Sequence, residues 1–517
     1  MPDQREYPSG IYGPGSGPPD DLALMDRDAA AGNDPSWLSG SYLEMSERWQ
    51  PMLVCMGGTQ AFRENAGGLL PIEPKEDEAA WNRRVSHAVL SPFAMRIADQ
   101  AAGLIMRKPI QLTPKQEGGE VDEYWTEWVK NVDGYGTDLD AFTRRLVLNS
   151  ILLGHSAVLV DFPTTEPAEN LLQERQRGLR PYFLEVRADQ ILGWRKEEES
   201  PLAPISQIRI SEYVTESVGM FGDKAVRQIR VLERGSYSIW RKGDNGWFKF
   251  EEGTTSLSNI PLAVTYSNKV CELMSTPPLL AVANLNILHA QRQADLQHAL
   301  HVAALPVMYL KAYEDTSNEI ALSANSAILL PENGEVGYAE PASSAFESQQ
   351  NFITELENQM RNLGISTLFS QTYVGETAEA KAMDRSDSDS MLSVVAQDLE
   401  AALQNALEMA ASYVGIECPK VVISRDFDLQ KLDGTQVQQY MGLWQNGAIT
   451  LQTLLEILSR GEILPDIDIE SEIELLESTK LAGLEMQAVI DEEVEEDDEG
   501  QQYVDDDVAA IIENSDA

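Results

Sequence analysis

Cysteine and positive charge are both scarce in this chain. Its 517 residues include three cysteines, Cys55, Cys271 and Cys418, which lie far apart and fit no metal-ligand spacing. A disulfide framework is therefore not expected, and a reducing compartment is. The 39 lysines and arginines are outnumbered by 84 aspartates and glutamates, for a formal net charge of -45. This balance argues against binding nucleic acid through a basic surface, because such binding depends on cations that release counterions from phosphates.

Long hydrophobic runs are also missing. No stretch of about 20 apolar residues is available to span a membrane, and the most apolar segment, 277–304, carries Asn284, His289, Arg292 and Asp295. The first residues, MPDQREYPSG, have neither a basic start nor an apolar core, so no signal peptide is expected. The apolar fraction of 43% still suffices for packed cores, and the length predicts about two to four structural units.

Catalytic signatures are equally sparse. The stretch GHSAV, 154–158, resembles the nucleophile elbow G-x-S-x-G, but Val158 replaces the last glycine and a helix precedes the strand instead of following it. A corner of small residues between a helix and a strand is the better interpretation. No Walker A motif and no G-x-G-x-x-G after a strand occurs, so neither phosphate nor dinucleotide binding is predicted.

Metal-binding patterns are incomplete. His298 and His301 form H-x-x-H, yet no Glu-x-x-His pair occurs to complete a site. Polar positions on a packed helix explain these histidines better. Asp384, Asp387 and Asp389 lack the glycine that a calcium loop needs among its acids. We therefore expect no metal, no cofactor and no enzymatic activity.

What the chain does contain is a definite order of segments. Residues 1–40 are rich in Gly, Pro and Asp and are expected to form a mobile arm. Helical patterns follow between 79 and 155: a helix broken at Pro92, an aromatic stripe in VDEYWTEWVK that is expected in the core, and an amphipathic helix leading into the strand SAVLVDFP. From 180 to 270, short β-type runs separated by turn signals predict a mixed α/β or mainly antiparallel unit.

A long helix and a β insertion are predicted next. Thr276 is a candidate N-cap and Pro277 a candidate first helical residue, and the helix meets no breaker before Pro306. Its first half is apolar nearly all round, so it needs cover from its own fold or from other copies of the chain. The insertion SAILLPENGEVGYAEP predicts a hairpin whose turn is PENG, 331–334.

Two further helices follow the insertion. The first is expected to end at Gly364, and its apolar face comprises Phe352, Leu356, Met360 and Leu363. Between Gly375 and Gly415 neither glycine nor proline occurs, which permits one helix of about 38 residues with Thr377 as its N-cap. The first half of this helix is polar and acidic. Its second half carries an apolar stripe at three-to-four spacing, formed by Met391, Val395, Leu399, Ala402, Ala406, Ala410 and Tyr413.

A strand, a helix pair and a tail complete the chain. The strand is PKVVIS, and the helix pair lies within GLWQNGAITLQTLLEILSRGEI. After Lys480 the tail holds no basic residue, so it is expected to be solvated.

The order of these parts resembles the portal protein of tailed bacteriophages, and most closely a portal-like family first catalogued as a domain of unknown function. The resemblance covers roughly residues 45–475 and leaves the arm and the acidic tail unexplained. The matching stretches are GLIMRKPIQL (103–112), LLGHSAVLVDFP (152–163), RPYFLEVRADQILGWR (180–195), QIRVLERGSYSIWR (228–241), GETAEAKAMDRSDSDSMLSVVAQDLEAALQNAL (375–407) and NGAITLQTLLEILSRGEIL (446–464).

The resemblance implies an α+β fold with phage portal architecture, in which a mixed α/β wing, a stem, a clip and a crown assemble as a ring. The implied segments are a flexible N-terminal arm (1–40), the α/β wing (41–275), a first stem helix (276–305), the clip (306–341), a second stem helix (342–365), a tunnel loop (366–376), a long wing or crown helix (377–414), a C-terminal wing strand with crown helices (415–485) and an acidic disordered tail (486–517).

The implied function is that of a head-to-tail connector. Such a protein forms a dodecameric ring at one capsid vertex of the virion and is assembled in the host cytoplasm. Double-stranded DNA would pass through the ring during packaging and ejection without sequence-specific binding. The implied partners are further copies of the chain, the terminase large subunit, a head-completion or adaptor protein, and the major capsid and scaffold proteins, with no membrane.

Two groups of residues are the implied sites. Acidic side chains in a channel would repel phosphates and let DNA slide. The residues expected along the channel, in the tunnel loop and at the start of the next helix, are Ser370, Gln371, Thr372, Tyr373, Glu376, Glu379 and Asp384. The residues expected to dock terminase or an adaptor on the clip are Pro331, Glu332, Asn333, Gly334 and Glu335.

Two other classes of protein stay open. Another phage ring, adaptor or structural assembly protein would share the long helices, although connectors are usually shorter. A cytosolic enzyme with an unrecognised site would need convergent polar groups in a pocket, which no motif indicates.

Overall fold

The structure is a computed structural model that divides into two compact units, Met1–Arg425 and Asp426–Ala517. Within them it describes residues 34–115, 119–163, 179–198, 200, 202–243, 246–303, 307–311, 335–339, 343–368, 378–425, 434–460, 463, 472–473, 475–476 and 478.

The first unit begins with helices, and its first described residues are packed. Residues 34–39, which the sequence assigned to the arm, contact the body: Ser39 N donates to Leu192 O at 3.0 Å, and Arg209 Nη1 donates to Pro35 O at 3.1 Å. Ser39 also caps α1, because its hydroxyl accepts from Tyr42 N at 3.1 Å. The helices are α1 (Gly40–Glu64), α2 (Ala66–Leu69), α3 (Glu78–His87) and α4 (Phe93–Ile105).

The sequence analysis predicted α3 and α4 but not α1 and α2. The predicted break at Pro92 is confirmed, since this residue immediately precedes α4. In α1, Gly58 adopts φ 64° and ψ -148°, a conformation open mainly to glycine. The kink divides α1 into a half that packs on the body, where Trp49 Nε1 donates to Leu153 O at 2.8 Å, and a half that leads into α2.

Two antiparallel sheets form the β part of the unit. The smaller has the order β3-β2-β9 and the larger the order β4-β5-β6-β7-β8, so the mainly antiparallel alternative is the correct one. The strands are β2 (His155–Asp161), β3 (Tyr182–Arg187), β4 (Ile191–Lys196), β5 (Ile205–Val218), β6 (Gly222–Glu233), β7 (Ser236–Gly243), β8 (Gly246–Thr254) and β9 (Leu262–Tyr266).

One buried cluster joins the two sheets. It draws on β2 and β3 from one sheet and on β4, β5 and β6 from the other, so the sheets share a core. Its buried members are Ala157, Leu159, Leu184, Val186, Ile191, Ile208, Ile210, Leu232 and Leu273. The aromatic stripe predicted for the core is confirmed, because Trp125 and Trp128 of α5 (Glu123–Trp128) are buried, and α6 (Leu139–Leu153) leads into β2 as predicted.

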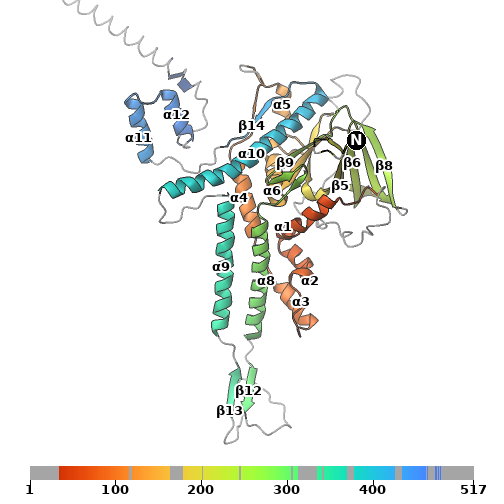
Figure 1. Ribbon diagram of the computed structural model, residues 1–517, viewed down its shortest axis with the longest axis vertical. Helices are drawn as coiled ribbons and strands as arrows, with labels where there is room; N and C mark the ends of the chain where they lie inside the picture. Colours follow the sequence, from red (N-terminus) through yellow and green to blue (C-terminus); the bar gives the residue numbers. More distant parts are fainter. Residues whose placement is uncertain are drawn as a thin grey trace, which may run out of the picture. The chain divides into compact units, whose positions relative to one another are not determined.

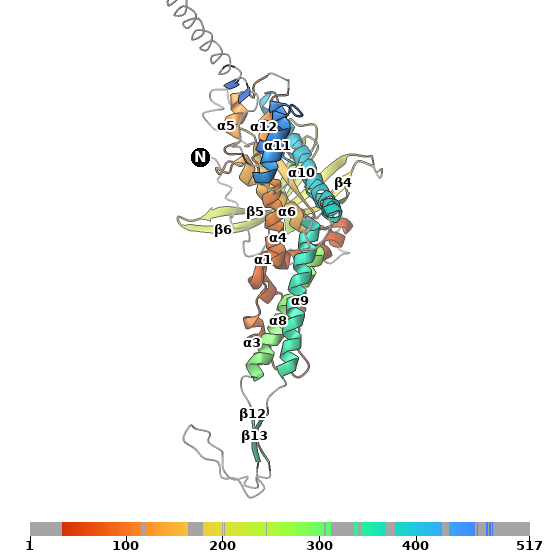
Figure 2. The same ribbon diagram turned by 90° about the vertical axis from the view of Figure 1, so that its left-hand side faces the viewer.

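Three long helices complete the first unit. In Figures 1 and 2, α8 (Leu280–Ala303) and α9 (Ser343–Leu368) run side by side away from the sheets, and a hairpin of β12 (Val307–Lys311) and β13 (Glu335–Ala339) lies beyond their far ends. The third helix, α10 (Ala378–Val414), has 37 residues, as the sequence predicted. Its strand neighbour β14 (Lys420–Val422) pairs with β1 (Gln111–Thr113).

Three local predictions about these helices are wrong: the N-cap at Thr276, the first helical position at Pro277 and the end of α9 at Gly364. Thr276 does not cap α8, which starts four residues later; its hydroxyl accepts from Arg48 Nη1 at 3.2 Å. Gly364 does not end α9, which continues to Leu368. A Cβ at Gly364 would lie 2.2 Å from Ile97 Cδ1, so glycine here permits close approach of α9 to α4.

One strand of the predicted hairpin is described, and it pairs with a strand that the sequence analysis did not assign as its partner. The run EVGYA forms β13, but its partner is β12, with Val307 opposite Ala339 and Lys311 opposite Glu335. The PENG turn and the run SAILL lie outside the described residues.

The second unit contains α11 (Gly434–Gln445) and α12 (Leu451–Arg460). This confirms the predicted helix pair. Thr450 caps α12 through its hydroxyl, which accepts from Thr453 N at 3.2 Å. Among the helices that the structure describes in either unit, none has the length and apolar character to cross a membrane.

Candidate functional site

The paired helices α8 and α9 share a buried seam. On α9 the seam consists of Ile353, Leu356 and Met360, all buried. His289 of α8 reaches across, with Nε2 3.3 Å from Glu357 Oε1. Helices α8 and α9 therefore pack on each other along this seam. The strands β12 and β13 lie between the two helices in the sequence.

The apolar face of α9 differs from the predicted one. Leu356 and Met360 are buried as expected, but Phe352 is 46% exposed and Leu363 is 40% exposed. At 100° per residue, Phe352 and Leu363 lie close together at the edge of the buried sector. The helix therefore presents a partly apolar edge in addition to its seam with α8.

Cover for α8 comes largely from the same chain. Within the single chain, the buried side chains in and just before this helix include Leu279, Val282, Ala283 and Ile287. Helices α1, α3, α4 and α9 all contact α8, and Asn286 binds the first turn of α4, since its Oδ1 accepts from Ala94 N at 3.2 Å. Of the two sources of cover that the sequence left open, its own fold is therefore the one that covers these residues.

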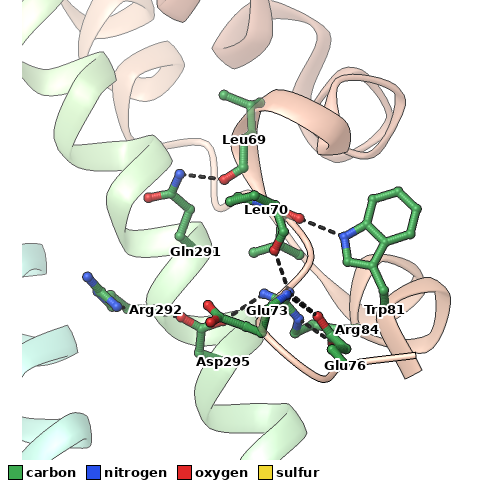
Figure 3. Close-up of polar contacts among 10 residues, drawn as sticks. Leu69, Leu70, Glu73, Glu76, Trp81, Arg84, Gln291, Arg292 and Asp295 are labelled. Atoms are coloured by element: carbon green, nitrogen blue, oxygen red, sulfur yellow. Dashed lines mark hydrogen bonds and ion pairs between the residues drawn. The ribbon is translucent and has the colours of Figure 1, made fainter. Parts of the chain in front are cut away.

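A buried ion cluster fastens α3 to α8 (Figure 3). Arg84 of α3 donates to Glu76 Oε2 at 2.7 Å and to Asp295 Oδ1 of α8 at 3.1 Å. Its Nη2 also donates to Pro71 O at 2.7 Å. The side chains of Arg84 and Glu76 are almost fully buried, and the Arg84 hydrogen bond holds the pKa of Glu76 below its usual value.

Neighbouring polar contacts extend this fastening. Gln291 Nε2 donates to Leu69 O at 2.5 Å, and Trp81 Nε1 donates to Leu70 O at 2.7 Å. Figure 3 shows both contacts beside the Arg84 cluster, which comprises Arg84, Glu76 and Asp295. Together they tie the chain between α2 and α3 to the shaft of α8.

A groove of about 510 Å³ lies between α1, α2 and α8. Its lining mixes carboxylates and amides, such as Glu47, Glu64 and Asn284, with apolar side chains, such as Val54 and Ile287. It is lined by no histidine, cysteine, serine, threonine, tyrosine or lysine. The titratable side chains in its lining are the carboxylates of Glu47 and Glu64.

The hairpin beyond α8 and α9 carries one described residue of the predicted docking site. Glu335 is exposed on β13, and its Oε2 lies 3.4 Å from Lys311 Nζ across the ladder. Tyr309 lies over Gly337 on the opposite strand, where a Cβ would come within 2.7 Å of its ring. An aromatic ring covering a strand glycine stabilises such a short hairpin. Pro331, Glu332, Asn333 and Gly334 lie outside the described residues.

The predicted channel residues fall at the limit of what the structure describes. Ser370, Gln371, Thr372, Tyr373 and Glu376 lie outside the described residues. Glu379 and Asp384 are in α10, whose start follows the predicted loop. Both channel and docking assignments stay predictions.

The second half of α10 is anchored to strand backbones as well as to the core. Its predicted stripe is confirmed from Val395 to Ala410, which are buried. Three of its polar side chains accept from backbone N–H groups: Asp398 from Tyr266 at 2.6 Å, Glu400 from Ile423 at 3.0 Å and Gln404 from Val421 at 2.9 Å. These contacts fix the end of the helix on the body.

The stretch GHSAV forms the predicted corner. Gly154 has φ 95°, and a Cβ there would lie 2.3 Å from Ser275 Oγ. His155 Nδ1 lies 2.7 Å from Ser275 Oγ, and burial lowers the pKa of His155 to about 4. Ser156 donates instead to Leu146 O at 2.6 Å. All these side chains are buried, so the pair is closed to a substrate.

The Cys55 thiol and possible metal ligands are the next candidates for a chemical role. Burial raises the pKa of the Cys55 thiol to about 12, which suppresses its thiolate. Among the described residues, no group of three or more His, Cys, Asp or Glu side chains is placed to hold a metal ion.

Sequence reasoning missed three features. The Arg84 cluster has no local pattern, because its members come from positions far apart in the chain. The kink at Gly58 had a signal in the pair Gly57-Gly58, since such pairs permit sharp kinks. The long extension of β5 and β6 was visible only as two strand-like runs around a glycine turn.

Comparison with known proteins gives one family match. Residues 278–414 match the family described as a domain of unknown function (DUF4055). The match covers about a quarter of the chain, from the turn before α8 to the end of α10. The expected family, one first catalogued as a domain of unknown function, is thus confirmed for this segment. None of the curated proteins matches the sequence.

Solved structures show a distant likeness. One chain in the neck of an empty gene transfer agent (GTA) particle, computed with C6 symmetry, is 11% identical, with 75% of this chain and 94% of that chain covered and a TM-score of 0.39. A chain in the virion of a native GTA particle is 13% identical, and the match covers 72% of this chain and 90% of that chain with a TM-score of 0.38. A chain in the neck of a native GTA particle, computed with C12 symmetry, is 11% identical. The match covers 71% of this chain and 89% of that chain with a TM-score of 0.38.

Proposed function

We propose that this chain is a portal protein, a non-enzymatic ring of about twelve copies at one vertex of a phage capsid. DNA passes through the ring during packaging and ejection. One observation carries the proposal: two antiparallel helices, α8 and α9, hold a hairpin away from the sheets, and a 37-residue helix follows directly. This is the order of parts of a stem, a clip and a long wing helix.

The physical arrangement supports this assignment. The Arg84 cluster fastens α3 to α8. Helix α9 packs on α8, and its side chains Ile353, Leu356 and Met360 are buried. Residues 369–377 connect α9 to α10 in the sequence, and this connection is the proposed tunnel loop. A chain of charge -45 repels DNA, which suits a channel through which DNA must slide.

The hairpin is the proposed docking surface for terminase and for head-completion or adaptor proteins. It is a small unit at the far end of two helices, and Glu335 is exposed on it. The residues proposed to contact partners are Pro331, Glu332, Asn333, Gly334 and Glu335. The residues proposed along the channel are Ser370, Gln371, Thr372, Tyr373, Glu376, Glu379 and Asp384. Acidic side chains on the hairpin favour a basic partner surface.

Removal of the chain from an assembling particle tests the function. Particles made without it are expected to contain no DNA, and supplying the chain in trans is expected to restore packaged DNA. Heads that fill with DNA at normal levels without the chain would contradict a portal role.

A further inference from the structure

The five-stranded sheet has an outer face, opposite the buried cluster that joins the two sheets. Ile208 and Ile210 of β5 belong to that cluster, so Arg209 between them points to the outer face. The strand pairings extend this assignment to β4, β6, β7 and β8. The outer face carries cations and aromatic rings: Arg195, Arg209, Arg227, Lys242 and Lys249, with Tyr213, Trp240 and Trp247.

The charge of this face departs from that of the chain. In the described strands of the sheet, five cations share the face with three acids, Asp223, Glu233 and Glu252, although acids outnumber cations by 84 to 39 in the sequence. Tyr213 is 43% exposed, and Lys249 Nζ lies 5.8 Å from the centre of the Trp240 ring. Such a surface suits an acidic partner that also carries apolar side chains.

The N-terminal part of the chain already lies on this face. Ser39 N donates to Leu192 O of β4 at 3.0 Å, and Arg209 Nη1 of β5 donates to Pro35 O at 3.1 Å. From Ser39 back to Pro35 the chain therefore passes from β4 to β5. Continued in the same direction, it meets β6, β7 and β8 next, where the remaining cations of the outer face lie.

The first described residues are held firmly at this point. Pro35 and Ser36 are buried, and Asp34 Oδ1 accepts from Ser36 N at 2.8 Å. Burial and then Arg195 lower the pKa of Arg209, whereas the carboxylate of Asp34 raises it. One acidic residue of the N-terminal chain thus already lies close to the cations of the outer face.

The residues that precede Asp34 have a matching composition. Segment 20–33, DDLALMDRDAAAGN, holds four aspartates and one arginine together with two leucines and a methionine. Asp28 lies six residues before Asp34, which is about 20 Å of extended chain. The spacings from β5 to β8 add up to about 14 Å, so the segment is long enough to place its carboxylates over each of these strands.

We propose that segment 20–33 docks on the outer face of its own chain, with its aspartates beside Arg227, Lys242 and Lys249 and its apolar side chains on the aromatic rings. The same chain is favoured over a second copy because Pro35 is fixed on β5, which gives the adjoining segment a high effective concentration at the face. This docking goes beyond the proposed function and does not depend on a ring.

Tryptic cleavage after Arg27 in the full chain tests the docking. Lys242→Glu with Lys249→Glu is expected to speed this cleavage about fivefold or more, because each exposed charge pair shifts an equilibrium by up to a few-fold and reversal adds repulsion. Both lysines are exposed, so the thermal unfolding temperature is expected to stay unchanged. Added salt should speed the cleavage in the wild type and have a smaller effect in the variant.

Lys130→Glu with Lys224→Glu is the matched control. It makes the same change in net charge at exposed positions, but Lys130 lies outside the sheet and Lys224 lies opposite Glu216 on the other face of β6. Cleavage at the wild-type rate is expected in this control. Equal cleavage rates in the wild type and in both double variants would overturn the docking.

A photoreactive side chain at position 25 identifies the surface that the segment contacts. Unlabelled copies that carry it are mixed with an excess of isotopically heavy copies that lack it. Irradiation is expected to link position 25 to an unlabelled peptide from residues 205–254. Links to heavy peptides, or to peptides outside the sheet, would overturn docking on the same chain. Short duplex DNA that binds the wild type but not Lys242→Glu with Lys249→Glu, without any change in cleavage after Arg27, would assign the face to nucleic acid instead.

Discussion

At the scale of single residues, charged and polar groups buried far from any substrate hold the fold in place. Arg84 shows this best, because its guanidinium meets Glu76, Asp295 and the Pro71 carbonyl at once. A buried cation paired in this way cannot be removed without leaving buried carboxylates uncompensated.

Loss of the Arg84 cluster should loosen α3. Arg84→Met is expected to cost about 3 kcal/mol in local stability, because Glu76 then stays buried without its partner. Amide hydrogen exchange in α3 measures this loss as roughly a hundredfold fall in protection. Arg83→Met is the matched control, since Arg83 is exposed on the same helix. Equal exchange rates in the two variants would refute the role given to the cluster.

The buried His155 should make stability depend on pH. Its folded pKa of about 4 lies below the unfolded value of about 6.5, so between these values the unfolded chain binds more protons. Stability is then fully present above about pH 6.5 and declines by up to about 3 kcal/mol as the pH falls to 4.

Urea unfolding at several pH values measures this slope. His155→Gln is expected to flatten it, and His87→Gln, at an exposed position, is expected to preserve it. If stability falls with pH to the same extent in the wild type and in His155→Gln, the lowered pKa of His155 is not the cause of the pH dependence.

At the scale of elements, sequence periodicity located the helices and strands well, but not what they contact. The length of α10 followed from the absence of Gly and Pro between Gly375 and Gly415. The end of α9 was misplaced because Gly364 serves a tertiary contact with Ile97, which no local pattern reveals. The partner of β13 was equally hidden, because strand pairing depends on the distant ends of α8 and α9.

Close packing at Gly364 gives a prediction for the α9–α4 contact. Gly364→Ala is expected to destabilise the chain by about 1–3 kcal/mol, because the added Cβ overlaps Ile97. Ile97→Ala in the same chain should relieve part of this overlap. Gly103→Ala in α4 is the control: its Cβ meets nothing within 4 Å, so it should stabilise by up to about 1 kcal/mol. Thermal unfolding compares them, and a neutral Gly364→Ala would contradict the close approach.

The hairpin between α8 and α9 should act independently of assembly. Replacing PENG, 331–334, by a Gly-Ser turn of equal length is expected to preserve oligomers and weaken terminase binding, because β12 and β13, which flank the proposed docking residues in the sequence, lie beyond both helices (Figures 1 and 2). Pull-down with purified terminase measures the binding, with an unaltered oligomer as the control. Undiminished binding and packaging would remove the hairpin from the docking site.

At the scale of the whole molecule, the acidic balance bears on both the proposed ring assembly and the proposed passage of DNA. The charge of -45 was plain from composition, and it argues against DNA binding through a basic surface without excluding the transit of DNA. The functional residues were less accessible from the sequence, because channel and docking roles depend on how copies are arranged in a ring.

Added positive charge in the proposed channel should slow DNA. Gln371→Lys with Thr372→Lys is expected to reduce packaged DNA length at low salt, because each cation gains phosphate contacts that must be broken as DNA moves. The deficit should shrink as salt rises, and oligomer assembly serves as the control. Full-length packaging at wild-type speed and low salt would show that residues 366–376 do not contact DNA.

The most direct measurement is electron microscopy of the purified chain, combined with the mass of the assembled particle. A portal predicts closed rings of about twelve copies with a central channel. Those rings should become more abundant as salt screens the repulsion between acidic copies. A chain that stays monomeric at micromolar concentration across this salt range, with no rings in the images, would contradict the account.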